Sequence, residues 1–201
     1  MIFKYAKIFA MNSRFLRSAP FFGDGGLEKL KGSHVAVFGI GGVGSYAVES
    51  LCRGGIGEIT LVDSDVYSIS NINRQLYAVT DTIGKKKVDV AKERALSINP
   101  EIKVNVYDKF VLQDDIGDID FSKFDYVIDA IDTISGKLEI IKQSKTLGVP
   151  VISAMGAGNK LDQTAFKVAD IKNTKVCPLC KVMRKLLKDN QSDSLNVVYS
   201  E

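Results

Sequence analysis

The sequence predicts an α/β fold built on a doubly wound, mainly parallel sheet. Three observations predict it: short apolar runs alternate with helical patterns, a glycine-rich turn follows the first run, and an acidic residue ends the second. The 201 residues, 45% of them hydrophobic and 25% charged, are enough for one domain with a sizeable core.

The stretch from residue 34 to residue 63 reads as strand, glycine turn, helix and strand. The strands are the apolar runs 34–38 and 58–62, and we expect the helix to begin near Gly42. The turn has the pattern G-x-G-x-x-G, which permits a tight bend and lets the backbone approach a phosphate; its glycines are Gly39, Gly41, Gly42 and Gly44. Asp63 ends the second strand, where its carboxylate can accept both ribose hydroxyls. We interpret this unit as a Rossmann-like nucleotide-binding core rather than a turn without a ligand.

Alternating elements continue along the chain. We expect helices at 84–98, 134–147 and 178–188, and strands at 102–106, 125–129, 150–153, 165–169 and 196–200. Ahead of the first strand, the glycine-rich segment 22–26 is expected to be flexible and 27–31 to form one helical turn. The ligand crevice of such a sheet lies at the carboxyl ends of its strands, where we expect Asp63, Asp129 and Asp132 to face it.

Polar residues after the second strand favour ATP over a nicotinamide dinucleotide. The connection 64–75 is too long for a routine loop, and it carries Arg74; Lys87 lies on the next helix. Both cations can reach a triphosphate above the glycine turn, Arg74 through paired hydrogen bonds and Lys87 as a point charge. Asn71 and Gln75 can bind the sugar or the α-phosphate through their amides.

Asp129 and Asp132 end the fourth strand, where carboxylates can hold Mg2+ against ATP phosphates. The structural alternatives are that these acids cap the following helix and that Lys87 belongs to a solvated helix face with Lys85 and Lys86. The only histidine, His34, is interpreted as a strand-start residue rather than a catalytic one.

Composition limits the class of protein. A net charge of +3 permits an anionic partner without indicating one. No apolar run approaches the roughly 20 residues of a membrane span, and residues 1–10 have no signal-peptide cleavage site after them, so we expect a cytoplasmic protein without a membrane partner. Three cysteines make no disulfide framework, which suits a reducing compartment.

The motifs together resemble those of the ubiquitin-activating-enzyme-like (ThiF/MoeB-type) adenylating enzymes. Besides the glycine turn, the resemblance rests on segments 63–65, 70–75, 84–87 and 129–132. It implies an ATP site in which Asp63 holds the ribose and Asp132 holds Mg2+. The other residues of that site are Gly39, Gly41, Gly42, Gly44, Asp65, Asn71, Arg74, Gln75 and Lys87. The implied catalytic residues are Arg74, Lys87 and Arg17. Arg17 matches a position from which a partner subunit's arginine reaches ATP in dimeric relatives, which implies a homodimer.

Four further segments look like those of the tRNA threonylcarbamoyladenosine dehydratases: 73–78, 98–101, 126–132 and 153–162. Such an enzyme uses ATP to adenylate the threonyl carboxylate of threonylcarbamoyladenosine in tRNA, and the neighbouring carbamoyl group then displaces AMP and closes a ring. The resemblance implies an N-terminal extension at 1–13, an adenylation domain at 14–170 and a partial C-terminal appendage at 171–201. Because relatives usually extend further, it also implies that their C-terminal part is missing here.

The segment 177–188 departs from that pattern. Cys177 and Cys180 stand where relatives more often have Asp-Pro, and a helix start at Pro178, a zinc site and thiol chemistry all stay open for the pair. The helix after Pro178 is amphipathic, with a basic face formed by Lys181, Arg184, Lys185 and Lys188. That face is either solvated or, together with Lys172 and Lys175, a contact for the tRNA backbone.

Three other functions remain open. The first is activation of the C-terminal carboxylate of a ubiquitin-like sulphur-carrier protein. The second is a nicotinamide oxidoreductase, which the glycine turn and Asp63 alone permit. The third is a nucleotide-sensing module that binds ATP without turnover.

Overall fold

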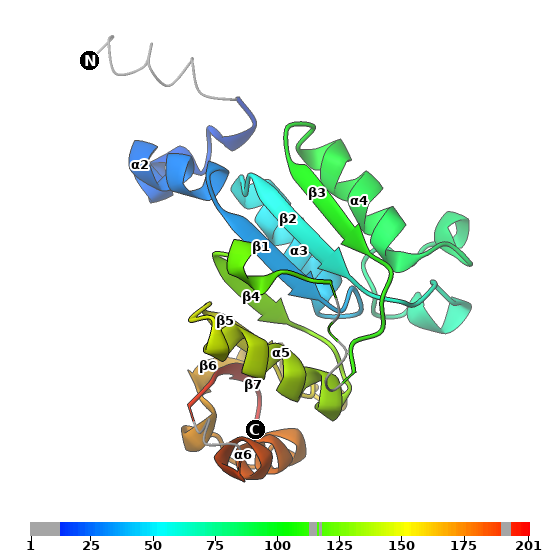
Figure 1. The fold of residues 1–201 in the computed structure, drawn as a ribbon. Helices are drawn as coiled ribbons and strands as arrows, with labels where there is room; N and C mark the ends of the chain where they lie inside the picture. Colours follow the sequence, from blue (N-terminus) through cyan, green and yellow to red (C-terminus); the bar gives the residue numbers. More distant parts are fainter. Residues whose placement is uncertain (1–12, 113–115, 117, 190–193) are drawn as a thin grey trace.

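The strands form one seven-stranded sheet in the order β3-β2-β1-β4-β5-β7-β6, parallel throughout except for the antiparallel β6–β7 pair (Figure 1). The computed structural model describes residues 13–112, 116, 118–189 and 194–201. Its strands are β1 (His34–Phe38), β2 (Glu58–Val62), β3 (Lys103–Tyr107), β4 (Tyr126–Asp129), β5 (Val151–Ala154), β6 (Lys167–Asp170) and β7 (Asn196–Tyr199). Its α-helices are α2 (Ala19–Lys31), α3 (Gly44–Gly54), α4 (Lys87–Ile98), α5 (Ile134–Thr146) and α6 (Pro178–Asp189). The predicted α/β class with a doubly wound, mainly parallel sheet is confirmed.

Two hydrophobic cores cover the two faces of the sheet. Alternate residues of β1 point to opposite faces, so Val37 belongs to one core and Phe38 to the other. The first core joins β1 and β2 to α3 and α4 through side chains such as Val48 and Ala91. The second lies under α5 and α6. Because apolar residues are buried on both faces, the strands read in the sequence as continuous apolar runs.

The register of the central strands brings three loop starts to one point. Phe38 of β1 pairs with Val62 of β2 and with Asp129 of β4. The residues that follow, Gly39, Asp63 and Ala130, therefore leave the sheet at the same edge. The chain passes from β1 to β2 on one side and reaches β4 on the other, so this edge holds the topological switch point at which α/β sheets bind ligands.

Two expectations about secondary structure, one for the segment before β1 and one for the segment after β2, are wrong. Residues 22–26, expected to be flexible, lie within α2, which is kinked at Gly23 (φ 66°) and is held by the buried Leu27. The helix expected from residue 84 begins at Lys87 instead. Lys86 pairs with Val66 in an isolated antiparallel bridge, and this contact keeps the chain extended up to the helix start.

The last described strand lies inside the sheet rather than at its edge. β7 pairs with β5 on one side and with β6 on the other, so residues 196–199 join the sheet that carries the site. Within the described ranges, every helix is too short or too polar to pass through a lipid bilayer.

Candidate functional site

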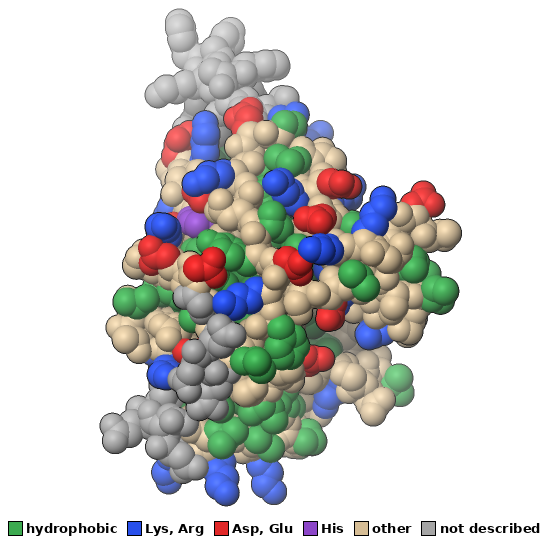
Figure 2. Space-filling model, turned by 45° about the vertical axis from the view of Figure 1, so that its right-hand side comes forward, with side chains coloured by type: hydrophobic (Ala, Val, Ile, Leu, Met, Phe, Trp, Pro, Cys, Tyr) green, Lys and Arg blue, Asp and Glu red, His purple; other side chains and the backbone are tan. Residues whose placement is uncertain are grey.

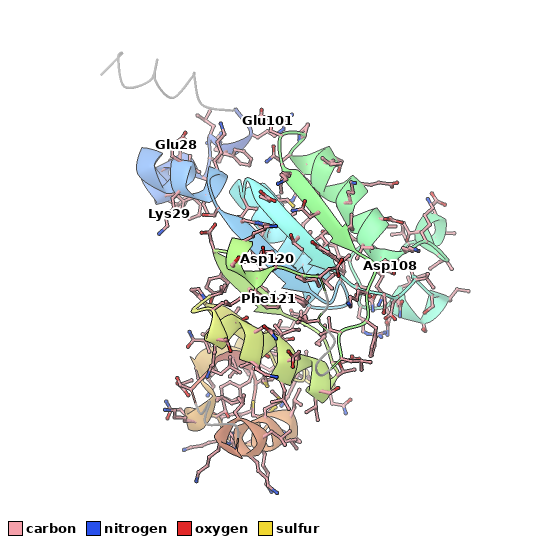
Figure 3. The ribbon with its side chains drawn as sticks, in the orientation of Figure 1. Glu28, Lys29, Glu101, Asp108, Asp120 and Phe121 are labelled. Atoms are coloured by element: carbon pink, nitrogen blue, oxygen red, sulfur yellow. The ribbon has the colours of Figure 1, made fainter. Side chains whose placement is uncertain are left out.

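A cavity of about 630 Å3 opens at the carboxyl ends of β1, β2 and β4. Most of the predicted site residues line it: Gly39, Gly41, Gly42, Asp63, Asp65, Asn71, Arg74, Gln75, Lys87 and Asp132. The edge of the sheet is visible in Figure 3, where Asp108 follows β3 on the cavity side and Glu101 precedes β3 on the opposite side. Segments far apart in the sequence therefore meet in one concave site.

Two glycines of the turn after β1 are required by packing against neighbouring backbone, and two others face the cavity. Gly39 has a φ of 86°, and a Cβ there would lie 2.7 Å from the carbonyl oxygen of Ala130. A Cβ on Gly44 would lie 1.7 Å from the carbonyl oxygen of Gly39, so both residues must be glycine for β1 and α3 to pack. A Cβ on Gly41 or Gly42 would make no protein contact closer than 3.6 Å. These two glycines leave backbone exposed to the cavity, as a phosphate at a helix N-terminus requires.

Asp63 is held by the loops on both sides of it. Its Oδ2 accepts a hydrogen bond from the Ile40 backbone N–H at 2.6 Å, and its Oδ1 accepts one from the Asp65 N–H at 2.9 Å. Burial raises the pKa of the Asp63 carboxyl above its ordinary value, against the opposing effect of these hydrogen bonds. The carboxylate is thereby fixed beside the glycine turn, where a ribose of a phosphate-bound nucleotide would lie.

Lys87 is buried, with 6% of its side chain exposed, and its Nζ donates to Asp65 Oδ2 at 2.6 Å. The second carboxylate, Asp63 Oδ1, lies 3.9 Å away. Lys85 and Lys86 are exposed, so the alternative that Lys87 shares their solvated face is wrong. A buried ammonium with an exposed carboxylate partner can exchange that partner for a phosphate oxygen.

The polar connection after β2 presents three further groups to the cavity. Arg74 Nη1 donates to the Ser70 carbonyl and to Asn73 Oδ1, both at 2.9 Å, which leaves its other donors for a ligand. Asn71 Oδ1 accepts the Ser68 N–H at 3.1 Å, so its NH2 group remains. Gln75 is buried, and its Oε1 has no hydrogen-bond partner among the described residues. A buried amide oxygen without a partner indicates a ligand donor at this point.

Asp129, the last residue of β4, and Asp132, three positions later, lie in different environments. Asp132 is exposed and lines the cavity, and the N-cap residue of α5 is Thr133, so Asp132 does not cap that helix. The expectation that Asp129 faces the crevice is wrong. Asp129 is fully buried and pairs with Lys137 Nζ at 3.1 Å. That ammonium also donates to the Ala154 carbonyl at 2.8 Å, so the pair joins the cavity-lining ends of β4 and β5.

Two predicted site residues do not line the cavity. Gly44 is buried at the start of α3, where its role is packing. Arg17 is exposed and precedes α2, away from the cavity of its own chain.

The cavity also has walls that the sequence prediction did not include. Lys109 and Phe110 follow β3, Met155 to Gly158 follow β5, and Leu179 comes from α6. The rule that loops after parallel strands line the crevice could have found the first two groups, since both directly follow strands. Leu179 could not be found in this way because it reaches the cavity from a helix packed beyond the sheet.

Cys177 and Cys180 are free and buried, and α6 begins at Pro178 between them, which confirms the predicted helix start. Burial raises the pKa of Cys177, but hydrogen bonds from Cys180, Leu179 and Gly156 outweigh it and hold that pKa below its usual value. No group of three or more metal-type side chains is found in the described part of the chain, so the pair has no further zinc ligands there. His34 begins β1 as predicted, with Nε2 2.8 Å from Thr60 Oγ1.

Taken together, the site has features that suit a nucleotide phosphate chain. Free backbone N–H groups at the glycine turn, a guanidinium and an ammonium converge on one cavity beside a fixed carboxylate. Apolar side chains such as Phe110 and Met155 provide a surface for a flat ring.

Comparison with known proteins identifies related chains. The chain is 44% identical over 192 residues to the tRNA threonylcarbamoyladenosine dehydratase of Bacillus subtilis (strain 168), covering 95% of this chain and 76% of that protein. It is similar to the solved structure of the Escherichia coli tRNA N6-threonylcarbamoyladenosine dehydratase TcdA in complex with ATP, with a TM-score of 0.85 and 37% identity over 93% of this chain and 80% of that one. An adenylyltransferase and sulfurtransferase of Debaryomyces hansenii is 37% identical over 134 residues, 67% of this chain and 29% of that protein.

The model of the ThiF family matches residues 13–197, which include every described strand except the last two residues of β7. The matched range contains the glycine turn, the polar connection after β2 and the loops after β4 and β5. The chain therefore belongs to the ThiF family.

Proposed function

We propose that the chain uses ATP to adenylate the threonyl carboxylate of threonylcarbamoyladenosine in tRNA and closes that group to its cyclic form. The observation that carries the proposal is the convergence of Arg74, Lys87 and Asp63 with the glycine turn on one cavity. The likeness to the Bacillus subtilis and Escherichia coli dehydratases supports the choice of substrate. A tRNA substrate and three free cysteines suit the cytoplasm, which is the location we propose.

The reaction has two steps. The threonyl carboxylate oxygen attacks the α-phosphorus of ATP, the bond to the leaving pyrophosphate breaks, and an acyl adenylate forms. The neighbouring carbamoyl group then attacks the activated carbonyl carbon, AMP leaves with the electron pair, and the carbamoyl group loses one N–H proton to solvent as the ring closes. Arg74 and Lys87 neutralise charge on the phosphates, and the backbone N–H groups at the glycine turn orient them. The second step needs mainly positioning, because both reacting groups belong to one molecule.

Asp132 is the residue that we propose for Mg2+. It is an exposed carboxylate on the cavity wall, and Mg2+ is commonly held by one or two carboxylates with phosphate oxygens and water. The ion would neutralise phosphate charge when bound. A site made by one protein carboxylate and the nucleotide fits the finding that the described residues form no complete metal cluster by themselves.

We also propose that two copies of the chain form a dimer in which Arg17 reaches the partner's ATP. Arg17 is exposed and does not line the cavity of its own chain. Large apolar side chains near it are exposed as well, namely Leu16, Phe21 and Phe22. A surface of this kind is typical of an interface.

The second candidate is activation of a ubiquitin-like sulphur-carrier protein, which the partial identity to the Debaryomyces hansenii adenylyltransferase favours. It uses the same ATP chemistry but a different carboxylate. We rank it second because that relative covers a smaller part of this chain than the dehydratases do.

The test measures AMP and pyrophosphate from ATP and Mg2+, with and without tRNA that carries threonylcarbamoyladenosine. Arg74→Ala should reduce turnover by about 100-fold or more, because charge stabilisation at the phosphates is lost. Arg53→Ala removes an exposed arginine of α3 outside the cavity and should leave turnover nearly unchanged. Turnover that needs a carrier protein instead of tRNA would favour the second candidate. ATP binding without product would favour a sensing module. NAD binding without pyrophosphate release would favour an oxidoreductase.

A further inference from the structure

Helix α6 has one face in the core and one in solvent. Met183 and Leu187 are buried in the second core, and Cys180 is fully buried beside them. Lys181, Lys185 and Lys188 are exposed. Residues at spacings of four and three lie on one stripe of a helix, so these three ammonium groups form a single row about 10 Å long. We call this row the α6 lysine stripe.

The α6 lysine stripe lies apart from the ion pairs of the described side chains. None of its three lysines forms an ion pair with a carboxylate in the part of the chain that the structure describes. Arg184 has a different role, since its Nη1 donates to the Thr174 carbonyl at 2.9 Å and ties α6 to the preceding segment. Figure 2 shows basic side chains next to one another at the lower end of the molecule, where Figure 1 places α6, with no acidic side chain between them.

The helix that carries the stripe also contributes to the cavity wall. Leu179, in the first turn of α6, lines the cavity, and Lys181 follows two positions later on the solvent side. Gly156, which also lines the cavity, donates its backbone N–H to Cys177 just before the helix. The start of α6 is thus part of the cavity wall, and the lysine row lies on the solvent side of the same helix.

The composition of the stripe indicates which polyanion it suits. Lysines without interleaved aromatic side chains suit phosphodiester backbone rather than unpaired bases, which stack on aromatic rings. A basic amphipathic helix can also bind a membrane, but this requires a free apolar face, and that face of α6 is buried in the core.

We propose that the α6 lysine stripe, Lys181, Lys185 and Lys188, binds the phosphodiester backbone of the substrate RNA and guides the reacting nucleoside to the cavity at Leu179. The proposal deepens the proposed function, because it names the surface that would hold the tRNA. It predicts binding that depends on charge and not on the modified base.

The experiment uses the full chain and unmodified tRNA transcript, with the dissociation constant measured over a range of salt concentrations. The triple variant Lys181→Ala, Lys185→Ala, Lys188→Ala should bind about tenfold or more weakly at roughly 0.1 M salt. The slope of log K against log salt should fall by about one for each lysine removed. The matched control is Lys29→Ala, Lys31→Ala, Lys92→Ala, which removes the same charge from exposed lysines of α2 and α4. Figure 3 shows Lys29 at the end of the molecule away from α6.

The outcomes separate the proposal from the proposed function. An equal loss of affinity in both triple variants, or no loss in the α6 variant, would overturn the proposal even if wild-type turnover of modified tRNA is intact. The proposal is supported if only the α6 variant loses affinity for tRNA and the Lys→Arg triple at the same positions keeps the wild-type affinity. This holds even if no AMP forms. Each single variant, expected to lower the slope by about one, replaces the triple if the triple fails to fold.

Discussion

At the scale of single residues, the four glycines of the turn after β1 have two different roles. Gly39 and Gly44 are required by the protein itself, because a Cβ at either would collide with backbone. A Cβ on Gly41 or Gly42 would make only ordinary van der Waals contacts, at 3.6 Å or more, so packing does not require glycine there and the proposed ATP phosphates would.

This difference predicts opposite defects for two matched substitutions. Gly44→Ala should lower the free energy of unfolding by about 3 kcal/mol or more, since a backbone contact of 1.7 Å cannot be relieved by a side-chain rotation. Gly41→Ala should change it by less than about 1 kcal/mol but weaken ATP binding about tenfold or more. Urea denaturation and ATP titration measure the two effects. If Gly41→Ala binds ATP normally, the phosphate does not lie on this turn.

The buried pair of Lys137 and Asp129 is the second residue-scale feature. Both side chains have 0% exposure, and Lys137 bridges Asp129, Ser153 and the Ala154 carbonyl. Asp129 Oδ1 also accepts the Ile131 N–H at 3.3 Å. Ile131 and Ala154 line the cavity, so the pair joins two walls of the site although neither Asp129 nor Lys137 lines the cavity itself.

Lys137→Met should therefore cost about 3–5 kcal/mol of unfolding free energy, because it leaves the Asp129 carboxylate buried and unpaired. Adding Asp129→Asn should recover part of that loss, since the remaining amide carries no charge. The double-mutant cycle is measured by urea unfolding. Additive effects of the two substitutions would show that the pair contributes no coupling energy.

At the scale of elements, the entry to α6 contains backbone strain. Val176 has a φ of 64°, which is rare for a β-branched residue, and the residue is 75% exposed. Its position directly before Cys177 and Pro178 makes the chain turn sharply into the helix. Since the side chain buries little surface, the strain is not offset by packing of Val176 itself.

Val176→Gly should consequently stabilise the fold, by up to about 1 kcal/mol, because relief of strain exceeds the added entropy of the unfolded chain. The control is Val168→Gly on β6, a strand valine of similar exposure at 67%. It should destabilise by about 0.5–1 kcal/mol. Chemical denaturation of both variants compares them directly, and equal destabilisation by the two glycines would mean that position 176 is not strained.

At the scale of the whole molecule, the proposed dimer predicts the turnover of a mixture of two inactive variants. Arg17→Ala and Arg74→Ala should each be nearly inactive when pure. If Arg17 reaches across the dimer, an equal mixture should recover about a quarter of wild-type turnover, because half of the dimers are mixed and each has one intact site. AMP formation after subunit exchange measures it. Turnover no higher than the average of the two pure variants would place Arg17 in the cavity of its own chain or outside catalysis.

The predictions from sequence were most accurate where local pattern and position in the sheet agree. The strands 34–38 and 58–62 match β1 and β2, because apolar β-branched runs buried on both faces are unambiguous. Cavity residues such as Asp63, Arg74 and Lys87 were found because they follow strand ends at a known edge. Residues 22–26 were misassigned because glycine content suggests a loop, while packing of Leu27 holds the segment in a helix.

The α/β fold, the edge of the sheet that carries the site and most of the polar groups in it could therefore be predicted from local sequence patterns. These follow from periodicity, glycine spacing and the direction of parallel strands, all of which are local. Which charges are buried became known only from the packing of the elements. Asp129 points to Lys137 rather than the cavity, Lys87 is enclosed beside Asp65, and α6 supplies Leu179 to the wall. Such pairings depend on how distant elements pack, and no local pattern contains that information.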